Sequence, residues 1–234
     1  VIKLMRKIFN NILPGLLILI SNLIFGQTTK WEPLYSYNNI SKGFIADNTI
    51  VAVADNSLLF YNIGQNNYQT VTTIDGLTGD SFSAIALYQN TVIAGFDNGL
   101  VAKIDIDTKE ISFDSSIVRN QAISPEKKRI NSIQIVNGLA YFATGFGIVE
   151  INPRTLAFGD TYYIGNVGVY NGGVLHATVF NENIYAATQD GLYATSLKNQ
   201  DRLRFSSWGA PIALGRWVVL WKKNGVLNGG MQLN

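Results

Sequence analysis

The residue types that most often carry catalysis or bind metals are scarce in this chain of 234 residues. It has no cysteine and a single histidine, His176. These counts exclude a thiolate nucleophile, a disulfide, an iron–sulfur cluster, a zinc thiolate site and any metal centre with several histidines, so no cofactor is expected. His176 stands in an apolar stretch that predicts a strand, where a hydrogen-bonded core or channel residue is favoured over a general base.

Carboxylates could supply acid–base chemistry or a calcium site, but their spacing favours turns. Asp105, Asp107 and Glu110 resemble half of a calcium-binding loop. The equivalent positions of the next repeat are not acidic, which favours a solvated turn instead. Asp97 and Asp190 stand beside turn glycines, where aspartate side chains often bond to the backbone. Different repeats could bring two carboxylates together for glycoside hydrolysis, but no pair stands out, and we predict that the protein is not an enzyme.

A run of basic residues is the main candidate for a binding site. Lys127, Lys128 and Arg129 are consecutive, and Arg119 precedes them in the same segment. We interpret them as a patch for an anionic ligand, such as a lipopolysaccharide headgroup, or for an acidic partner; a solvated loop with a turn set by proline is the alternative. A role in solubility is expected for three arginines assigned to outer hairpins, Arg154, Arg202 and Arg204.

The elements that must position these residues are copies of one pattern. Each copy has an apolar strand, a polar turn, a second strand rich in alanine, valine and aromatic residues, a tight turn and a third strand. Four clear copies occupy residues 46–58, 88–100, 136–148 and 180–192. Their tight-turn residues, Ser57, Gly99, Gly147 and Gly191, are 42 to 48 residues apart. A period of roughly 40 to 50 residues with about four short strands is typical of a β-propeller blade.

We therefore predict an all-β fold, a β-propeller of about four and a half four-stranded blades over residues 27–234. The repeats are expected near residues 40–80, 81–129, 130–173 and 174–215, with an incomplete blade at 216–234. Because a propeller closes its ring to cover the strands of its end blades, we expect a truncated part of a larger, seven-bladed ring. A changed reading frame near the end is an alternative to a fragment of a longer product.

Loop lengths indicate which face of the propeller carries a site. In a four-stranded meander, the turn between the second and third strands lies on the same face as the crossover to the next blade. The crossovers are longer and more varied than the other turns, the segment 118–130 above all. Longer loops on a rigid scaffold often carry binding, so the basic run is expected on the partner surface.

The first 26 residues are typical of an export signal. Lys3, Arg6 and Lys7 form a positive n-region ahead of an interrupted apolar run, which ends at the small residue Gly26. A retained anchor is the alternative, although the run is too interrupted for the roughly 20 apolar residues of a membrane-spanning helix. The remaining chain has 15 basic and 16 acidic residues, so we expect neither nucleic-acid binding nor a transmembrane span. Export to the periplasm or the outer-membrane surface is predicted.

Four motifs, taken in order, resemble the amino-terminal propeller family of PorZ, an accessory component of the bacterial type IX secretion system. They are WEPLYSY at 31–37, TTIDGLTG at 72–79, KKRINSI at 127–133 and FGDTYYIG at 158–165. The resemblance extends from about residue 27 to the end of the chain.

This resemblance implies a non-enzymatic part of the cell-surface attachment complex, which works with the sortase PorU and delivers anionic lipopolysaccharide for attachment to cargo. It supplies no catalytic residue. The family's second propeller and carboxy-terminal domain have no counterpart in this sequence. The turns also resemble those of periplasmic sensor propellers of hybrid two-component regulators, for example at 186–192, and this is the alternative. A propeller lyase or glycosidase is a third, less favoured class.

Overall fold

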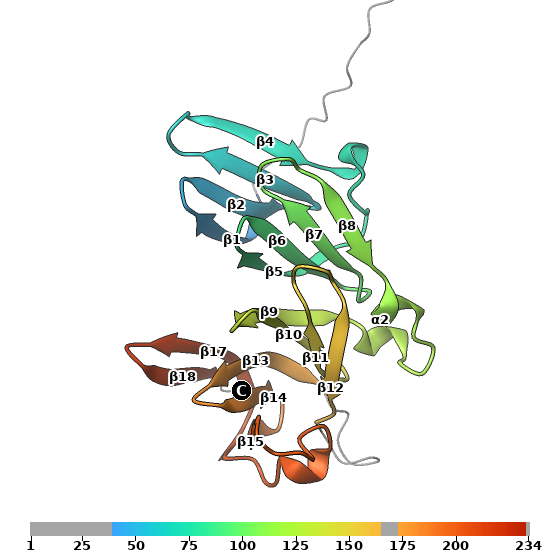
Figure 1. Cartoon of the computed structure of the whole chain (residues 1–234), viewed down its shortest axis with the longest axis vertical. Helices are drawn as coiled ribbons and strands as arrows, with labels where there is room; N and C mark the ends of the chain where they lie inside the picture. The colour runs from blue at the N-terminus through green and yellow to red at the C-terminus, as the bar shows by residue number, and fades with distance from the viewer. Residues whose placement is uncertain (1–38, 165–172, 233–234) are drawn as a thin grey trace, which may run out of the picture. The chain divides into compact units, whose positions relative to one another are not determined.

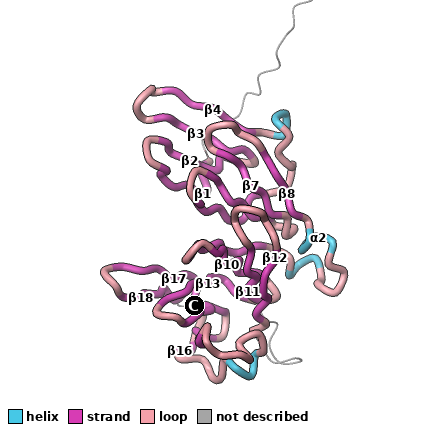
Figure 2. The backbone as a smooth tube through the Cα atoms, in the orientation of Figure 1, coloured by secondary structure: helices cyan, strands magenta, loops and turns pink. Residues whose placement is uncertain are grey.

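The computed structural model describes residues 39–164 and 173–232, and it confirms the all-β fold (Figure 1). The strands form four four-stranded antiparallel sheets and one two-stranded sheet. In each sheet, strands that follow one another in the sequence are hydrogen-bonded neighbours. Figure 2 shows that strands make up most of the described backbone and that helices are short. These sheets are the blades that the repeat predicted.

The blades follow one another along the chain. Blade 1 contains β1 (Ile40–Ala46), β2 (Thr49–Ala54), β3 (Ser57–Asn62) and β4 (Asn67–Val71). Blade 2 contains β5 (Phe82–Tyr88), β6 (Thr91–Phe96), β7 (Val101–Asp105) and β8 (Ile111–Asp114). Blade 3 contains β9 (Ile130–Val136), β10 (Leu139–Thr144), β11 (Gly147–Ile151) and β12 (Phe158–Tyr162). Blade 4 contains β13 (Val174–Phe180), β14 (Asn183–Thr188), β15 (Gly191–Ser196) and β16 (Ala213–Leu214). The two-stranded blade 5 contains β17 (Trp217–Lys223) and β18 (Val226–Met231).

Short helices lie only in the connections of the described part of the chain. They are η1 (Thr73–Asp75), α2 (Ser116–Arg119), η2 (Pro125–Lys127) and η3 (Phe205–Ser207). None of these helices is long and apolar enough to cross a membrane. The predicted signal segment, with Lys3, Arg6 and Lys7, lies outside the described residues.

The hydrophobic core lies between successive blades. One cluster joins Leu58 and Phe60 of blade 1 to Phe96 and Ile104 of blade 2, and similar clusters join blades 2 and 3, 3 and 4, and 4 and 5. The first strands of successive blades, β1, β5, β9, β13 and β17, also contact one another in that order. Sheets that pack face to face around their first strands are the arrangement of a propeller.

The first strand of every blade contains an irregularity near its start. The pairing register with the second strand shifts there, so one extra residue is accommodated. In blades 3 and 4 the extra residues are Asn131 and Leu175. Because a bulge changes the direction of a side chain, this repeated feature bears on the candidate site.

The tight turns between second and third strands are stabilised differently from the prediction. Thr188 Oγ1 accepts hydrogen bonds from the backbone N–H groups of Asp190 and Gly191, at 3.2 and 3.0 Å. Asn98 Oδ1 has this role in blade 2, where it accepts from the N–H of Leu100 at 2.9 Å. Among the described residues, the carboxylates of Asp97 and Asp190 accept no backbone N–H group. The acceptor in each turn is a neighbouring side chain, so the predicted role of these aspartates is wrong.

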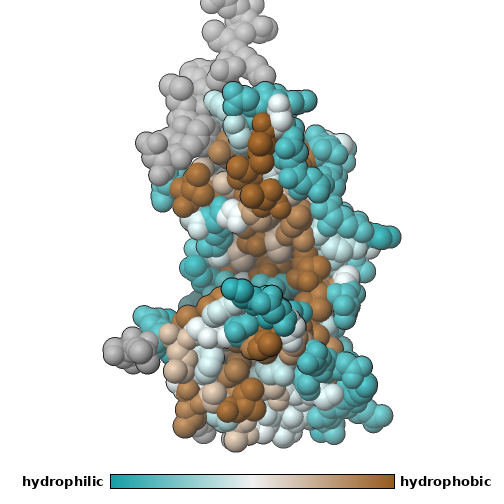
Figure 3. All heavy atoms as spheres, turned by 90° about the vertical axis from the view of Figure 1, so that its left-hand side faces the viewer, coloured by the Kyte–Doolittle hydropathy of each residue, from teal (hydrophilic) through white to brown (hydrophobic). Residues whose placement is uncertain are grey.

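Large hydrophobic side chains remain exposed on the two end blades of the described chain. Ile45 on β1 is 66% exposed, while Trp221 on β17 and Val226 on β18 are 45% and 58% exposed. In the view of Figure 3, hydrophobic residues gather along the middle of the face and hydrophilic residues lie mainly at its margins. With these exposed side chains, the surfaces of blades 1 and 5 are more apolar than an ordinary solvated sheet.

Candidate functional site

The segment between β8 and β9 carries the predicted basic cluster and is fixed to the blades at several points. Ile117 of α2 is buried and lies so close to Gly99 that a Cβ on this glycine would be 2.6 Å from the Ile117 side chain. Pro125 begins η2, which suits the fixed φ of proline. The Lys128 ammonium group donates to the backbone carbonyl of Val118 at 2.5 Å. Lys128 therefore has a structural role within the segment.

An ion pair connects this segment to the neighbouring tight turn. Arg129 Nη1 lies 2.9 Å from Asp97 Oδ1, and both side chains are about half exposed, at 53% and 44%. An exposed pair of this kind contributes little to stability, about 0 to 1 kcal/mol. It nevertheless places the tight turn of blade 2 beside the crossover that follows this blade, as the prediction for this face requires. We call this face of the propeller the crossover face.

A cavity of about 330 Å³ opens on the crossover face between blades 3 and 4. Its lining comes from the crossover, the bulges of β9 and β13 and the tight turns of both blades, and consists of Glu126, Lys127, Arg129, Asn131, Gly145, Gly173, Leu175 and Gln189. The two bulge residues Asn131 and Leu175 both contribute to it. Gly145 is required by close packing, since a Cβ there would lie 2.6 Å from the carbonyl oxygen of Lys127.

The structure brings only part of the predicted patch together. Lys127 and Arg129 line the cavity, whereas Lys128 bonds to Val118 and Arg119 is not part of the lining. Two lining amides, those of Asn131 and Gln189, were not predicted. Gln189 precedes a turn glycine, so the arrangement of turns on one face could have indicated it. The position of Asn131 depends on a bulge that the sequence does not reveal.

The charged side chains of the cavity lining are two cations and one carboxylate. Lys127 and Arg129 are opposed by one carboxylate, Glu126. The hydroxyl of Ser124 donates to Glu126, and this hydrogen bond lowers the pKa of the Glu126 carboxyl, with a smaller contribution from Lys127. Glu126 is therefore ionised at neutral pH, and Asp97, which is not part of the lining, pairs with Arg129. Asn131 Nδ2 donates to the Val174 carbonyl at 2.7 Å.

His176 is a buried residue of the blade interface, as predicted, but it is not fully hydrogen-bonded. Its Nε2 lies 3.3 Å from the side-chain nitrogen of Gln134 on β9, and its Nδ1 has no partner among the described residues. Burial lowers the pKa of His176 to about 4. The imidazole is therefore neutral at physiological pH. The prediction of a hydrogen-bonded histidine therefore holds for Nε2 but not for Nδ1.

The acidic turn after β7 behaves as an ordinary hairpin turn. Asp105 Oδ1 accepts from the backbone N–H groups of Asp107 and Thr108, at 2.9 and 2.8 Å. The hydrogen bond from Thr108 is the main cause of the lowered pKa of Asp105. Asp107 accepts from the Asn90 side chain at 2.8 Å. Within the part of the chain that the structure describes, no three acidic, histidine or cysteine residues are grouped as metal ligands.

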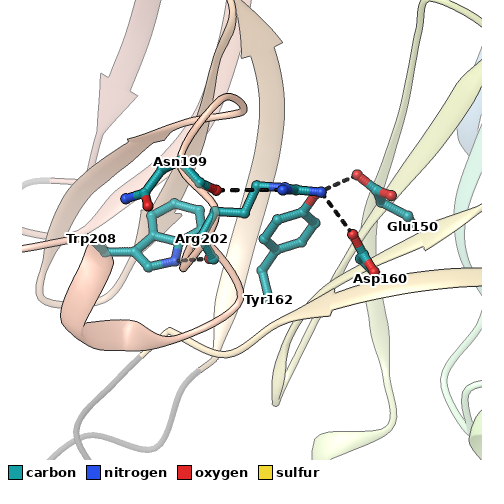
Figure 4. A network of polar contacts seen from close by, with 6 residues as sticks. All are labelled: Glu150, Asp160, Tyr162, Asn199, Arg202 and Trp208. Atoms are coloured by element: carbon teal, nitrogen blue, oxygen red, sulfur yellow. Dashed lines mark hydrogen bonds and ion pairs between the residues drawn. The ribbon is translucent and has the colours of Figure 1, made fainter.

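Arg202 is not a solvated hairpin residue, and that prediction is wrong. Its guanidinium group donates to Asp160 Oδ2 at 3.0 Å and to the carbonyl of Asn199 at 3.4 Å (Figure 4). Beside it, the Tyr162 hydroxyl donates to Glu150 Oε1 at 2.5 Å. Asp160, Tyr162 and Glu150 belong to blade 3, so the loop between β15 and β16 is joined to the preceding blade.

Aromatic residues enclose this network. The Trp208 indole N–H donates to the Arg202 carbonyl at 3.0 Å, and the rings of Trp208 and Tyr162 meet edge to face at 6.2 Å. Burial is the main cause of the raised pKa of Tyr162, and burial with the charge of Glu150 raises the pKa of Tyr141 to about 12. Both phenols stay protonated, so the network contributes to packing and ion pairing.

Four-stranded meanders that pack face to face define a β-propeller, and this one has a polar cavity among its crossovers. The chain belongs to a particular family of such propellers, the amino-terminal β-propeller domain of PorZ from the type IX secretion system, whose model matches residues 50–209. A comparison with curated protein sequences finds no match.

Several solved structures share the fold. One is PorZ of Porphyromonas gingivalis, described as an essential bacterial surface component of the type IX secretion system, with a TM-score of 0.64, 18% identity and coverage of 81% of this chain and 25% of that chain. Another is the extracellular domain of a putative one-component system of B. thetaiotaomicron, with a TM-score of 0.61, 18% identity and coverage of 85% and 26%. The computationally designed protein Ika8 gives 0.59, 12% identity and 82% and 55%. The chain thus spans about a quarter of the first two structures and about half of the third.

Proposed function

We propose that the protein is a non-enzymatic binding and scaffold propeller of the type IX secretion and cell-surface attachment machinery. The observation that carries this proposal is the family match over residues 50–209. A place in the periplasm or at the outer-membrane surface follows from the same proposal, as does a protein partner of the attachment complex such as a PorU-like sortase. Because the chain spans only a quarter of the PorZ structure, these whole-protein properties belong to the proposal.

The cavity of the crossover face is the proposed contact for anionic lipopolysaccharide. Lys127 and Arg129 line a space of about 330 Å³ together with the amides of Asn131 and Gln189 and the apolar Leu175. Arginine and lysine beside neutral amides suit a phosphate or carboxylate carried on a sugar. Arg129 can turn from Asp97 toward such a ligand because their pair is exposed.

Calorimetry with purified anionic lipopolysaccharide tests this contact. The double variant Lys127→Ala/Arg129→Ala should bind about tenfold more weakly, since it removes two charged contacts. The matched control is Lys222→Ala/Lys223→Ala, which removes two exposed lysines of β17 and should bind as the unchanged protein does. Thermal stability should change little in either variant. Equal binding by the two variants would remove the cavity from the proposal.

The sensor alternative has support from the fold alone. The likeness to the extracellular domain of the putative one-component system is at 18% identity, which says nothing of function. Reading the coding DNA beyond residue 234 discriminates the two: a membrane span followed by a kinase domain favours the sensor, and a second propeller with a small β-domain favours the secretion component.

A further inference from the structure

Equivalent grooves form between successive blades on the face opposite the crossovers. In blades 1, 2 and 3, a residue on the third strand faces the next blade. The part of the next blade that it faces is the turn between the third and fourth strands. The residues at this position are Phe60, Lys103 and Glu150, which pair across their sheets with Val51, Ile93 and Tyr141. The chain therefore offers three copies of one site geometry with three different linings.

The blade 3–4 groove is occupied by the protein's own side chains. Glu150 accepts from Tyr162, and Arg202 from the next blade pairs with Asp160 beside it. The polar groups of this groove thus bond to one another.

The blade 1–2 groove holds a cavity of about 180 Å³, but its main groups are also used internally. The Lys109 ammonium group lies 4.4 Å from the centre of the Phe60 ring and covers it. Asn62 Oδ1 accepts from the Gln65 backbone N–H at 2.9 Å, and Asn67 donates to the Gln65 side chain at 3.3 Å. Few strong hydrogen-bonding groups remain for a ligand.

The blade 2–3 groove differs from both. Its cavity measures about 210 Å³ and is bordered by Tyr88, Gln89, Thr91, Glu110, Ser112 and Arg154, among others. The Lys103 ammonium group donates to the Arg154 carbonyl at 2.8 Å and so connects the two blades across the groove. The side chains of Thr91, Glu110 and Ser112 make no hydrogen bond to another described residue. A carboxylate and two hydroxyls therefore line a concave space without a hydrogen-bond partner among the described residues, and a ligand could replace the water around them.

Charge and size restrict the ligand. The cationic side chains of the lining are Lys103 and Arg154, and its carboxylates are Asp105 and Glu110, so the groove carries no net charge and does not favour an ion. Its volume is below the roughly 300 to 1,000 Å³ of pockets that enclose a drug-sized ligand, which leaves room for one small polar unit. Hydroxyl-rich ligands match carboxylate and hydroxyl partners, and the Tyr88 ring offers an apolar surface.

We propose that the blade 2–3 groove binds one neutral pyranose residue of a glycan, with Glu110, Thr91 and Ser112 as hydrogen-bond partners of its hydroxyls. This site is separate from the crossover-face cavity, because its lining residues come from the opposite turns. The proposal of a glycan site does not depend on the proposed role in the secretion machinery.

Saturation-transfer NMR on the full chain tests the proposal. The probes are the methyl glycosides of glucose, galactose, mannose and N-acetylglucosamine, with methyl glucuronide as the charged comparison. At least one neutral glycoside should bind in the millimolar range and more tightly than the glucuronide. The variant Glu110→Ala/Ser112→Ala should bind about tenfold more weakly, because two hydrogen bonds are lost.

Glu182→Ala is the matched control, since it removes an exposed carboxylate that pairs with Lys198 in blade 4; it should bind the glycoside normally. The Lys127→Ala/Arg129→Ala variant should also bind normally, which separates this proposal from the lipopolysaccharide contact. Three outcomes would overturn the proposal. They are no saturation transfer to any neutral glycoside at about 10 mM, equal affinity of Glu110→Ala/Ser112→Ala and the control, and tighter binding of the glucuronide.

Discussion

Replacing Arg202 by alanine should destabilise the protein by about 2 kcal/mol. Its side chain is 29% exposed and that of its partner Asp160 is 40% exposed. The pair therefore lies between exposed ion pairs, which contribute about 0 to 1 kcal/mol, and fully buried pairs, whose disruption costs about 3 to 5 kcal/mol. Loss of the packed aliphatic stem beside Tyr162 adds to the loss of the ion pair. The expected loss of stability in Arg202→Ala therefore lies between the values for exposed and for buried pairs.

Thermal and urea denaturation measure this effect. For a domain of this size, about 2 kcal/mol corresponds to a fall in Tm of roughly 4 to 8 °C. Arg204→Ala is the matched control, because Arg204 is exposed in the same loop and its removal should leave Tm unchanged. Asp160→Asn and the double variant complete a mutant cycle, in which we expect a coupling of about 1 kcal/mol.

An Arg202→Ala protein that unfolds at the same midpoint as Arg204→Ala would contradict this prediction. The ion pair and the packing of Arg202 would then contribute nothing measurable, and the loop between β15 and β16 would be joined to blade 3 by other contacts, such as those of Trp208. A large loss without coupling to Asp160 would assign the effect to packing instead of charge.

Two further predictions concern the interfaces between blades. Gly95→Ala should destabilise by about 1 to 3 kcal/mol, because its Cβ would lie 2.5 Å from the Ile130 side chain, whereas Gly79→Ala, with open space around it, should be neutral; equal midpoints in urea would contradict this. For His176, the folded pKa of about 4 lies below the usual value, so the unfolded chain binds more protons between about pH 6.5 and 4 and stability falls as the pH falls through that window. Denaturation at pH 7.5 and 5.0 should differ by about 2 kcal/mol from this histidine, and His176→Gln should lose that part of the dependence; an unchanged dependence in the variant would assign it to carboxylates.

The repeating part of the fold could be predicted from the sequence because it is local. A strand, a turn and a second strand leave a pattern within about a dozen residues, and the turn residues Ser57, Gly99, Gly147 and Gly191 mark the same point in each blade. Lys127 and Arg129 could be predicted for the same reason, since adjacent cations in a long crossover are visible without any tertiary contact.

The rest depends on which residues meet across an interface. Arg202 and its partner Asp160 are separated by a whole repeat, so the sequence offered only an arginine in a polar hairpin. The role of Lys128 was missed because the Val118 carbonyl that it binds is a backbone group, which has no sequence signature. Asn131 reaches the cavity through a bulge at the start of β9. One extra residue there does not alter the alternation along the rest of the strand, so the sequence pattern does not reveal it.

The three equivalent grooves have a consequence for how such a protein can change over time. Their position is fixed by the pairing of the third strand. At this position Lys103 and Glu150 lie outside the buried apolar clusters, whereas Phe60 belongs to the cluster that joins blades 1 and 2. A substitution at Lys103 or Glu150 can therefore alter one groove while the apolar contacts that hold neighbouring blades together persist, whereas a substitution at Phe60 would also remove a core contact. The lining of these grooves can therefore differ from blade to blade, and in the blade 3–4 groove the polar side chains join the two blades to each other.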